Sequence, residues 1–336
     1  ATSGPLPISS SIAGLSIYYA STSTGTFSWF VRQFAALENA MNSVERVQYY
    51  SDKVPQEESA EIIAGGVGIK NFNEMNWPVD GAINISNLKM RYRKGLPLVL
   101  NGLTVNIPGG SRVGIVGRTG CGKSSLMLCL LRVEPEIDDK TGDGPITLDK
   151  IDISKIPLSS LRTNVGIIPQ NPTLFSGTIR SNLDPFGAFT DDNIWDVLGK
   201  CGLKNVVQAM DNGLESKVAE YGENLSQGQR QLLCLGRVLM KNCKVLLLDE
   251  ATSSVDFETD EMIQDTLRKN FENTTVLTIA HRVNTIMDSD LIMVLDDGKV
   301  AELGSPAELL ENDHGHFNML VHASKKTTDE GKKSEK

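Results

Sequence analysis

Two kinds of hydrophobic spacing alternate along most of the chain. Short segments in which apolar residues alternate or run together predict β-strands, and segments with apolar residues three and four apart predict helices between several of them. Strands that alternate with helices form a mainly parallel sheet covered on both faces, so the pattern predicts an α/β domain. The predicted strands are residues 82–88, 98–107, 112–116, 161–168, 244–248, 275–280 and 291–295.

The N-terminal segment differs because it carries no charge. The first 31 residues contain no Asp, Glu, Lys or Arg, and residues 12–31 mix apolar side chains with many Ser and Thr. About 20 such residues can just span a bilayer, and Trp29 and Phe30 followed by Arg32 suit a membrane–water border. The many hydroxyls weaken this interpretation, and a flexible Ser/Thr-rich leader is the alternative.

Three further regions follow this segment. Residues 32–51 have apolar side chains at helical spacing, whereas residues 52–80 are rich in Gly and Pro and predict a linker. A compact domain is expected over residues 81–322. The charged and polar stretch 323–336 is expected to be a disordered tail.

Composition narrows the classes of partner. The chain has a net charge of -9, 40% hydrophobic and 22% charged residues, which is ordinary for a globular protein and argues against an extended nucleic-acid surface. Its five cysteines are dispersed and form no CxxC pair, which indicates free thiols in a reducing compartment. Any affinity for phosphate must therefore be local.

A glycine-rich loop supplies such an affinity. It follows the predicted strand 112–116, precedes an apolar helix over 124–131, and matches the pattern G-x-x-x-x-G-K-[ST]. Backbone N–H groups of this loop and the N-terminal end of the helix are expected to bind phosphate oxygens, with a lysine on the β- and γ-phosphates and a serine on Mg²⁺. The loop consists of Gly117, Arg118, Thr119, Gly120, Cys121, Gly122, Lys123 and Ser124.

A second motif ends the predicted strand 244–248 with two acids. Asp249 is suited to hold Mg²⁺ and Glu250 to polarise an attacking water. An apolar run that ends in Asp-Glu is common by itself, and the glycine loop in the same chain makes the combination specific. Together the two motifs predict a nucleotide-binding enzyme.

A third motif restricts the class further. Ser226 and Gly228 begin a second helix whose N-terminus favours anions, and Gln229 follows them. One chain would then have two phosphate-seeking helix ends. The simplest use is to offer the second one to another nucleotide-binding domain.

In this order the motifs resemble the ABC transporter nucleotide-binding domain over roughly residues 81–320. The resemblance implies a P-loop NTPase fold with a mixed sheet core, a β-subdomain and a helical subdomain that carries the signature Leu225–Gln229. It also implies ATP and Mg²⁺ as ligands and adds site residues by position. These are Tyr92 on adenine, Ser125 at the end of the phosphate loop, Gln170 on Mg²⁺, Glu220 before the signature, Asp256 of the D-loop and His281 on the γ-phosphate.

A finer resemblance is to subfamily C, the multidrug-resistance-associated proteins. Arg91-Tyr92-Arg93 and Asn182-Leu183-Asp184-Pro185 resemble the second nucleotide-binding domain of that family, and Trp29 to Val47 resembles the end of its last membrane helix with a cytosolic extension. Residues 1–51 are accordingly interpreted as that helix end and extension, in the C-terminal part of a multi-pass membrane protein. The domain would lie on the cytosolic side.

The resemblance implies partners and leaves alternatives. The partners would be the first nucleotide-binding domain and the membrane domains of the same transporter, with an organic anion, a conjugate or a drug as cargo. Gln227 replaces the usual signature glycine, which implies a weakened signature, whereas Glu250 is retained and implies a competent site on this chain. An ATP-gated regulatory or channel subunit and a soluble ABC ATPase are the alternatives.

Cys121 lies inside the phosphate loop, where Ala or Ser is usual. It is interpreted as a harmless small side chain. The sharper hypothesis is a reactive thiol at the positive end of a helix. In that case a thiol reagent should inhibit ATP hydrolysis, and bound ATP should protect.

Overall fold

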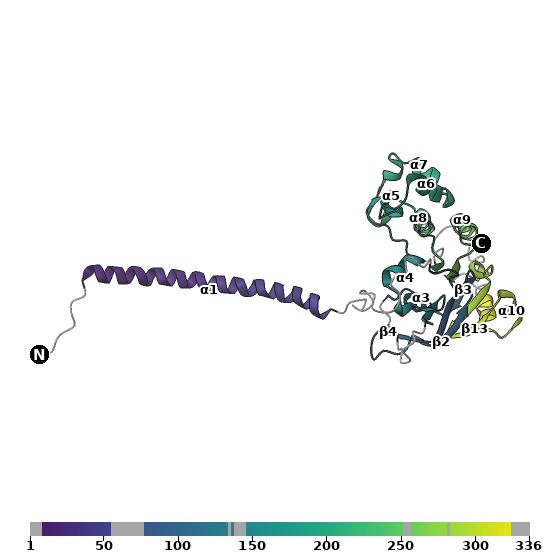
Figure 1. The fold of residues 1–336 in the computed structure, drawn as a ribbon, viewed down its shortest axis with the longest axis horizontal. Helices are drawn as coiled ribbons and strands as arrows, with labels where there is room; N and C mark the ends of the chain where they lie inside the picture. Colours follow the sequence, from purple (N-terminus) through teal and green to yellow (C-terminus); the bar gives the residue numbers. More distant parts are fainter. Residues whose placement is uncertain are drawn as a thin grey trace, which may run out of the picture. The chain divides into compact units, whose positions relative to one another are not determined.

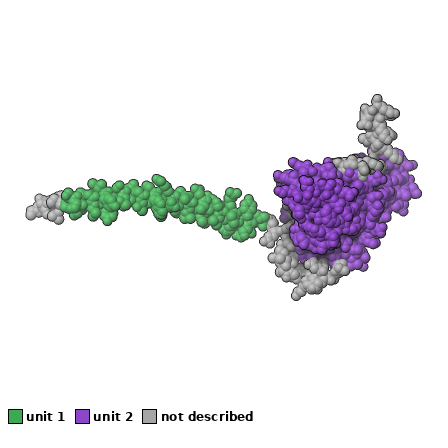
Figure 2. All heavy atoms as spheres, turned by 90° about the horizontal axis from the view of Figure 1, so that it is seen from above, with its two compact units in different colours: residues 1–57 green, residues 58–336 purple. Residues whose placement is uncertain are grey.

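The computed structural model describes residues 9–54, 77–133, 136–137, 146–250, 257–280 and 283–323 of the chain. The chain divides into two compact units, residues 1–57 and residues 58–336, drawn in green and purple in Figure 2. All strands in the described residues lie in the second unit (Figure 1). It is therefore the unit in which a nucleotide site has to be sought.

The first unit is described as one helix, α1 (Ser10–Lys53). The Ser9 hydroxyl caps it by accepting a hydrogen bond from the N–H of Ile12. Thr22, Thr24 and Thr26 donate their hydroxyls to carbonyls four residues earlier, so these polar side chains are satisfied along the helix itself. In the described part of the chain, no helix combines the length and the apolar character that crossing a membrane requires.

A six-stranded sheet forms the centre of the second unit (Figure 1). Its strand order is β13-β12-β3-β11-β10-β7; all neighbours are parallel except β13, which pairs antiparallel with β12. The mainly parallel sheet predicted from the alternating pattern is confirmed, and so is the mixed sheet core that the family resemblance implies. The strands are β3 (Arg112–Gly117), β7 (Val165–Ile168), β10 (Val245–Asp249), β11 (Thr275–Ile279), β12 (Leu291–Asp296) and β13 (Lys299–Gly304).

A second, antiparallel sheet packs against one face of the first. Its order is β2-β1-β5-β6, and β4 also pairs with β1. Alternate residues of β10 reach different cores: Val245 and Leu247 join the core under this sheet, and Leu246 and Leu248 join the core under the helices. The strands are β1 (Ile83–Arg91), β2 (Leu100–Ile107), β4 (Glu136–Ile137), β5 (Ile146–Leu148) and β6 (Ile151–Asp152).

Helices cover the other face and extend into a largely helical subdomain. There, α5, α6 and α7 gather beside α8 (Figure 1), together with a short hairpin of β8 (Gly177–Thr178) and β9 (Lys217–Val218). The helices of the second unit are α3 (Lys123–Leu130), α4 (Leu158–Asn164), α5 (Ile179–Leu183), α6 (Asp191–Lys200), α7 (Lys204–Gln208), α8 (Gln227–Lys241), α9 (Phe257–Asn270) and α10 (Pro306–Glu311). The 3-10 turns are η2 (Ile153–Lys155), η3 (Gly213–Glu215), η4 (Glu220–Gly222) and η5 (Val283–Ile286).

One predicted strand is half wrong. Residues 161–168 were expected to be extended, but the first half belongs to α4 and only β7 is a strand. Leu158 and Leu161 are both buried, and their spacing of three places both side chains on one face of a helix turn. A short apolar run cannot distinguish that arrangement from a strand.

Asp149 holds the backbone of residues 79–82, just before β1, in place. Its carboxylate accepts hydrogen bonds from four successive backbone N–H groups, those of residues 79–82, at 2.6, 3.1, 3.3 and 2.8 Å. The Trp77 indole donates to the carbonyl of Leu148 at 3.2 Å and is buried. The Thr275 hydroxyl, at the start of β11, donates to the carbonyl of Gly81 at 2.7 Å. The chain is thus tied to both sheets before β1 begins.

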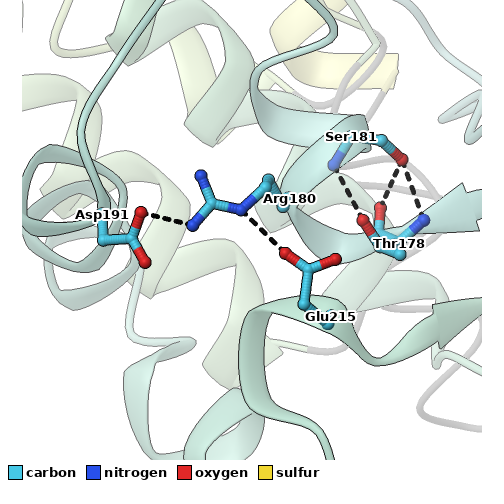
Figure 3. A network of polar contacts seen from close by, with 5 residues as sticks. All are labelled: Thr178, Arg180, Ser181, Asp191 and Glu215. Carbon is cyan, nitrogen blue, oxygen red and sulfur yellow. Dashed lines mark hydrogen bonds and ion pairs between the residues drawn. The ribbon is translucent and has the colours of Figure 1, made fainter. Parts of the chain in front are cut away.

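A polar network braces the helical subdomain (Figure 3). Arg180 on α5 contacts Asp191, the first residue of α6, and donates through Nε to Glu215 of η3 at 2.8 Å. Hydrogen bonds to these two carboxylates raise the pKa of the Arg180 guanidinium, and the bond to Asp191 contributes most. Thr178 and Ser181 form a reciprocal capping box that starts α5. One arginine therefore links α5, α6 and η3.

Candidate functional site

The predicted phosphate loop joins β3 to α3, as the sequence pattern required. Gly122 is the N-cap of α3 with φ 103°, and Ser124 lies exposed in the first turn. The Lys123 side chain is buried and folds back over the loop, where its Nζ donates to the carbonyls of Gly117 and Arg118 at 2.8 and 3.0 Å. Its ammonium group therefore lies at the loop, where a bound phosphate would need it.

The glycines of this loop are required for different reasons. A Cβ at Gly117 would lie 2.2 Å from the carbonyl oxygen of Leu295, and one at Gly122 would lie 2.6 Å from a methyl group of Leu100. A Cβ at Gly120 would meet no atom within 4 Å. At Gly117 and Gly122, a side chain is thus excluded by neighbouring atoms of the protein, not by a ligand. Only Gly120 leaves open space for a ligand.

The two acids follow β10 at the carboxyl end of the sheet. Asp249 ends the strand, and both carboxylates are half-buried. Glu250 has φ 47°, a left-handed conformation that costs a residue with a Cβ about 1–2 kcal/mol. Its N–H donates to the carbonyl of Ile279 on β11 at 3.1 Å, and its Oε2 accepts a hydrogen bond from Gln170 Nε2 at 2.9 Å.

The sheet order brings these groups to one edge. Strands β3 and β10 both flank β11 and run parallel to it, so the phosphate loop and the acids leave the sheet at the same end. Two strand spacings separate them, roughly 10 Å. Gln170 follows β7 on the far side of β10. The carboxyl edge of such a sheet is the usual ligand-binding side of an open α/β fold.

Tyr92 also reaches the phosphate loop. It follows the last residue of β1, is 50% exposed, and its hydroxyl lies 2.8 Å from the hydroxyl of Ser125 on α3. The exposed half of the ring leaves a surface on which a base can stack. Sequence reasoning placed both residues at the site but missed their contact, since no local pattern connects β1 with α3.

The signature residues begin another helix in another core. The Ser226 hydroxyl accepts from the Gln229 N–H, and the Gln229 side chain accepts from the Ser226 N–H, so the two form a capping box on α8. Gly228 lies against α9, where a Cβ would come within 2.9 Å of Thr259. Helix α3 packs in the core below the antiparallel sheet, and α8 packs in the helical core. The two helix N-termini thus belong to separate layers.

Glu220 lies on the surface just before the signature. It opens the turn η4 and is exposed, and the next residue, Tyr221, is 67% exposed with φ 54°. Arg230 on α8 donates to the carbonyl of Tyr221 at 3.4 Å. Glu220 is therefore presented on the surface by a short turn that is hydrogen-bonded to α8.

The segment after Gln170 is held by a half-buried arginine that sequence reasoning missed. Arg237 of α8 donates to the carbonyls of Asn182 and Thr173, both at 2.6 Å, and its guanidinium lies 5.4 Å from the ring centre of Phe175. Burial lowers the pKa of Arg237. Asn182 in turn exchanges hydrogen bonds with the backbone of Phe175. The spacing between these residues gave no signal, because the contacts join α5 to α8.

The predictions for His281, Asp256, Cys121 and the Mg²⁺ ligands remain to be compared with the structure. His281 and Asp256 lie outside the described residues. Cys121 is buried in the loop, with its Sγ 3.9 Å from Lys123 Nζ. For Mg²⁺, the serine hydroxyl of Ser124, the amide of Gln170 and the carboxylate of Asp249 offer only oxygen ligands, which fits an ion that is bound chiefly through substrate phosphates and water.

Comparisons with known proteins agree with this geometry. The family model described as ABC transporter matches residues 100–253. ABC transporter C family member 5 of Arabidopsis thaliana is 48% identical over 316 residues, which cover 94% of this chain and 20% of that protein. C family member 3 of Dictyostelium discoideum is 48% identical over 314 residues, with 94% and 21% covered.

A solved structure extends the comparison to the fold. The structure of a bacterial Atm1-family ABC exporter with ATP bound matches 73% of this chain and 42% of that one, with a TM-score of 0.66 and 33% sequence identity. The second unit is therefore an ABC-type nucleotide-binding domain, a class of domain that binds and hydrolyses ATP.

The chain belongs to the ABC transporter family, and its relatives are transporters of the C family, the multidrug-resistance-associated type. The predicted family and fold class are confirmed. The chain spans about a fifth of the length of the curated relatives that it matches.

Proposed function

We propose that this chain is the second nucleotide-binding domain of an exporter of the multidrug-resistance-associated type, and that its own site hydrolyses the ATP that drives export. One observation carries the proposal. The phosphate loop with Lys123 folded over it and the acids after β10 leave the same edge of one sheet, and Gln170 contacts Glu250 there.

The proposed reaction assigns a role to each group. Tyr92 stacks on adenine, and the N–H groups of residues 117–125 surround the triphosphate while Lys123 neutralises its β- and γ-phosphates. Ser124, Gln170 and Asp249 would hold Mg²⁺, which would supply charge neutralisation at the phosphates. Glu250 accepts the proton of the attacking water, and His281 stabilises the charge that develops on the γ-phosphate.

The site is completed by a partner domain. Ser226, Gly228 and Gln229 lie at the start of α8, which packs in a different core from α3, and this supports their use on the ATP of the first nucleotide-binding domain. The signature of that first domain would close over the γ-phosphate held here. Because Gln227 replaces glycine in the signature of this chain, the site that this signature serves would be the weaker of the two.

The remaining assignments follow from the C-family relatives. Residues 1–51 would be the end of the last membrane helix and its cytosolic extension, and the nucleotide-binding domain would lie on the cytosolic side of the membrane. Glu220, Gln170 and Asp256 would couple closure of the two domains to the membrane helices. The cargo would be an organic anion, a conjugate or a drug.

Glu250→Gln tests the proposal. The change removes the proton acceptor but keeps the shape, so ATP should still bind to this chain with little change in Kd, whereas hydrolysis by the complete transporter should fall at least about 100-fold. Uptake of a glutathione conjugate into inside-out vesicles should be lost in parallel. Lys123→Ala is the matched variant, and it should weaken binding itself.

Two results would contradict the proposal. Uptake by Glu250→Gln at the wild-type rate would remove Glu250 from catalysis. ATP-dependent gating of an ion current that survives this change, with no uptake in the wild type, would favour the regulatory subunit instead.

A further inference from the structure

A contact between two hydroxyl groups joins the end of β1 to the first turn of α3. The hydroxyl of Tyr92 lies 2.8 Å from the hydroxyl of Ser125, whose side chain is 5% exposed. Among the described residues, the Ser125 hydroxyl has no other hydrogen-bond partner. Because a buried hydroxyl without a partner is unfavourable, Tyr92 is the residue that satisfies it.

The backbone on both sides of this contact is held in place. Near the end of β1, the carbonyl of Met90 accepts a hydrogen bond from the N–H of Val99 at 2.8 Å. Val99 and Leu100 also lie against the phosphate loop, since a Cβ at Gly122 would come within 3.1 Å of the Val99 carbonyl oxygen and 2.6 Å of the Leu100 side chain. The end of β1 is thus fixed beside the N-terminus of α3, so the fold itself brings Tyr92 to the loop.

The contact leaves the ring of Tyr92 accessible. Half of the side chain is exposed, although its hydroxyl is held at the loop. A base can therefore stack on the ring while the hydroxyl keeps its hydrogen bond to Ser125. Stacking needs only the face of an aromatic ring, so the hydroxyl can serve a separate purpose.

The chemistry of the two hydroxyls indicates which one donates. A phenol is more acidic than an aliphatic alcohol, so the O–H of Tyr92 is the better donor and the oxygen of Ser125 accepts. The O–H of Ser125 then remains to donate to a phosphate oxygen, and the bond from Tyr92 polarises it. We infer that Tyr92 is a positioning residue for Ser125, and that its hydroxyl makes Ser125 a stronger donor to a bound triphosphate. This inference rests on the proposed function, in which residues 117–125 surround the triphosphate.

Inorganic tripolyphosphate tests this inference, because it carries no base that could stack on the ring. Tyr92→Phe keeps the ring and removes the hydroxyl, so the Kd of the full chain for tripolyphosphate with Mg²⁺ should rise roughly 3- to 10-fold, the worth of one hydrogen bond between neutral groups. Displacement of a fluorescent ATP analogue measures this Kd. Ser125→Ala should weaken binding at least as much. The double variant should bind no more weakly than Ser125→Ala, because both changes interrupt one chain of hydrogen bonds.

Two further variants separate positioning from a structural role. Ser125→Thr keeps a hydroxyl, so its binding of tripolyphosphate should still weaken when Tyr92→Phe is added. Tyr221→Phe removes the hydroxyl of another exposed tyrosine, in η4, and should leave the Kd unchanged. A hydroxyl of Tyr92 that only stabilised the fold would lower the temperature of unfolding in Tyr92→Phe and leave the Kd of the folded chain unchanged.

The outcomes distinguish this inference from the proposed function. If Tyr92→Phe weakens tripolyphosphate and ATP by the same factor, the positioning role is supported. If it weakens ATP alone, or neither ligand, the positioning role is wrong and the proposed function stands. If Lys123→Ala leaves the affinity for both ligands unchanged, the phosphate loop does not bind the triphosphate. In that case the proposed function fails, and the inference fails with it.

Discussion

At the scale of single residues, the site depends on backbone conformations that a side chain would oppose. Gly117 has φ 150° and Gly122 has φ 103°, and each lies against a neighbouring strand of the same protein. Glu250, by contrast, keeps its side chain in the left-handed region. Strain of this kind persists where the surrounding structure holds it, and it is common at functional sites.

The loop glycines should differ in what an added methyl group does. Gly117→Ala should destabilise the chain by roughly 2–4 kcal/mol and weaken ATP binding, because its Cβ would collide with the Leu295 carbonyl at an unfavourable φ. Gly120→Ala, the control on the same loop, meets no protein atom and should cost only about 1–2 kcal/mol. Urea unfolding measures both, and equal losses would contradict the explanation.

Burial of the thiols makes stability depend on alkaline pH. Burial raises the pKa of Cys129 and of Cys201 from 9.0 to about 12. The unfolded chain therefore releases these protons first, so the stabilisation is complete below pH 9 and is lost as the pH rises toward 12. Above pH 9, each such thiol should lower the free energy of unfolding by about 1.4 kcal/mol per pH unit.

Cys129→Ala checks this pH dependence. The variant starts from a lower stability because it leaves a small cavity, but its stability should fall less steeply than the wild type between pH 9 and 11. Urea unfolding under reducing conditions at several pH values gives both slopes. Identical slopes would show that Cys129 ionises as easily in the folded chain as in the unfolded one.

At the scale of elements, four strands of the central sheet, β3, β10, β11 and β12, could be predicted well because their apolar runs are bounded by glycine, charge or a motif. The helix α4 could not be predicted, because two buried leucines in seven residues are too few to show a helical period. The edge strand β13 was also missed, because its side chains alternate between half-buried and exposed and carry little hydrophobic signal. Among the site residues, each motif was found within its own element, and the contacts between elements were not.

The Arg180 network belongs to this scale, because one side chain joins α5, α6 and η3. Arg180→Met should lower the stability of the chain by at most about 1 kcal/mol, and the loss should shrink in high salt since the carboxylates are largely exposed. Lys200→Met is the control, as its ion pair with Asp196 lies within one helix. Urea unfolding at low and high salt is the measurement. A loss that does not change with salt would contradict the electrostatic explanation.

At the scale of the whole chain, residues far apart in the sequence make the nucleotide-binding domain one folded unit. The site combines groups that follow β1, β3, β7 and β10, and the helical subdomain contributes Arg237 to the support of Gln170. The sequence could predict which groups belong together only through the motif order. The order of strands in the sheet, in which β11 lies between β3 and β10, is known only from the structure.

The attachment at Asp149 should matter to the whole domain. Asp149→Ala removes four hydrogen bonds to residues 79–82 and should lower the free energy of unfolding by roughly 2 kcal/mol, with Asp149→Asn intermediate because one oxygen remains. Asp211→Ala, at an exposed turn, is the control and should have little effect. Denaturant unfolding compares the three, and an Asp149→Ala chain as stable as the wild type would contradict the role.

The same attachment has a mechanical meaning. Any tension that reaches Trp77 along the preceding chain arrives first at Leu148 of β5, then at Asp149 on the turn between β5 and β6, and at Thr275 on β11. The hydrogen bonds there are loaded together, so they resist peeling better than a ladder opened one bond at a time. A pull on the chain would therefore load the antiparallel and the central sheet together.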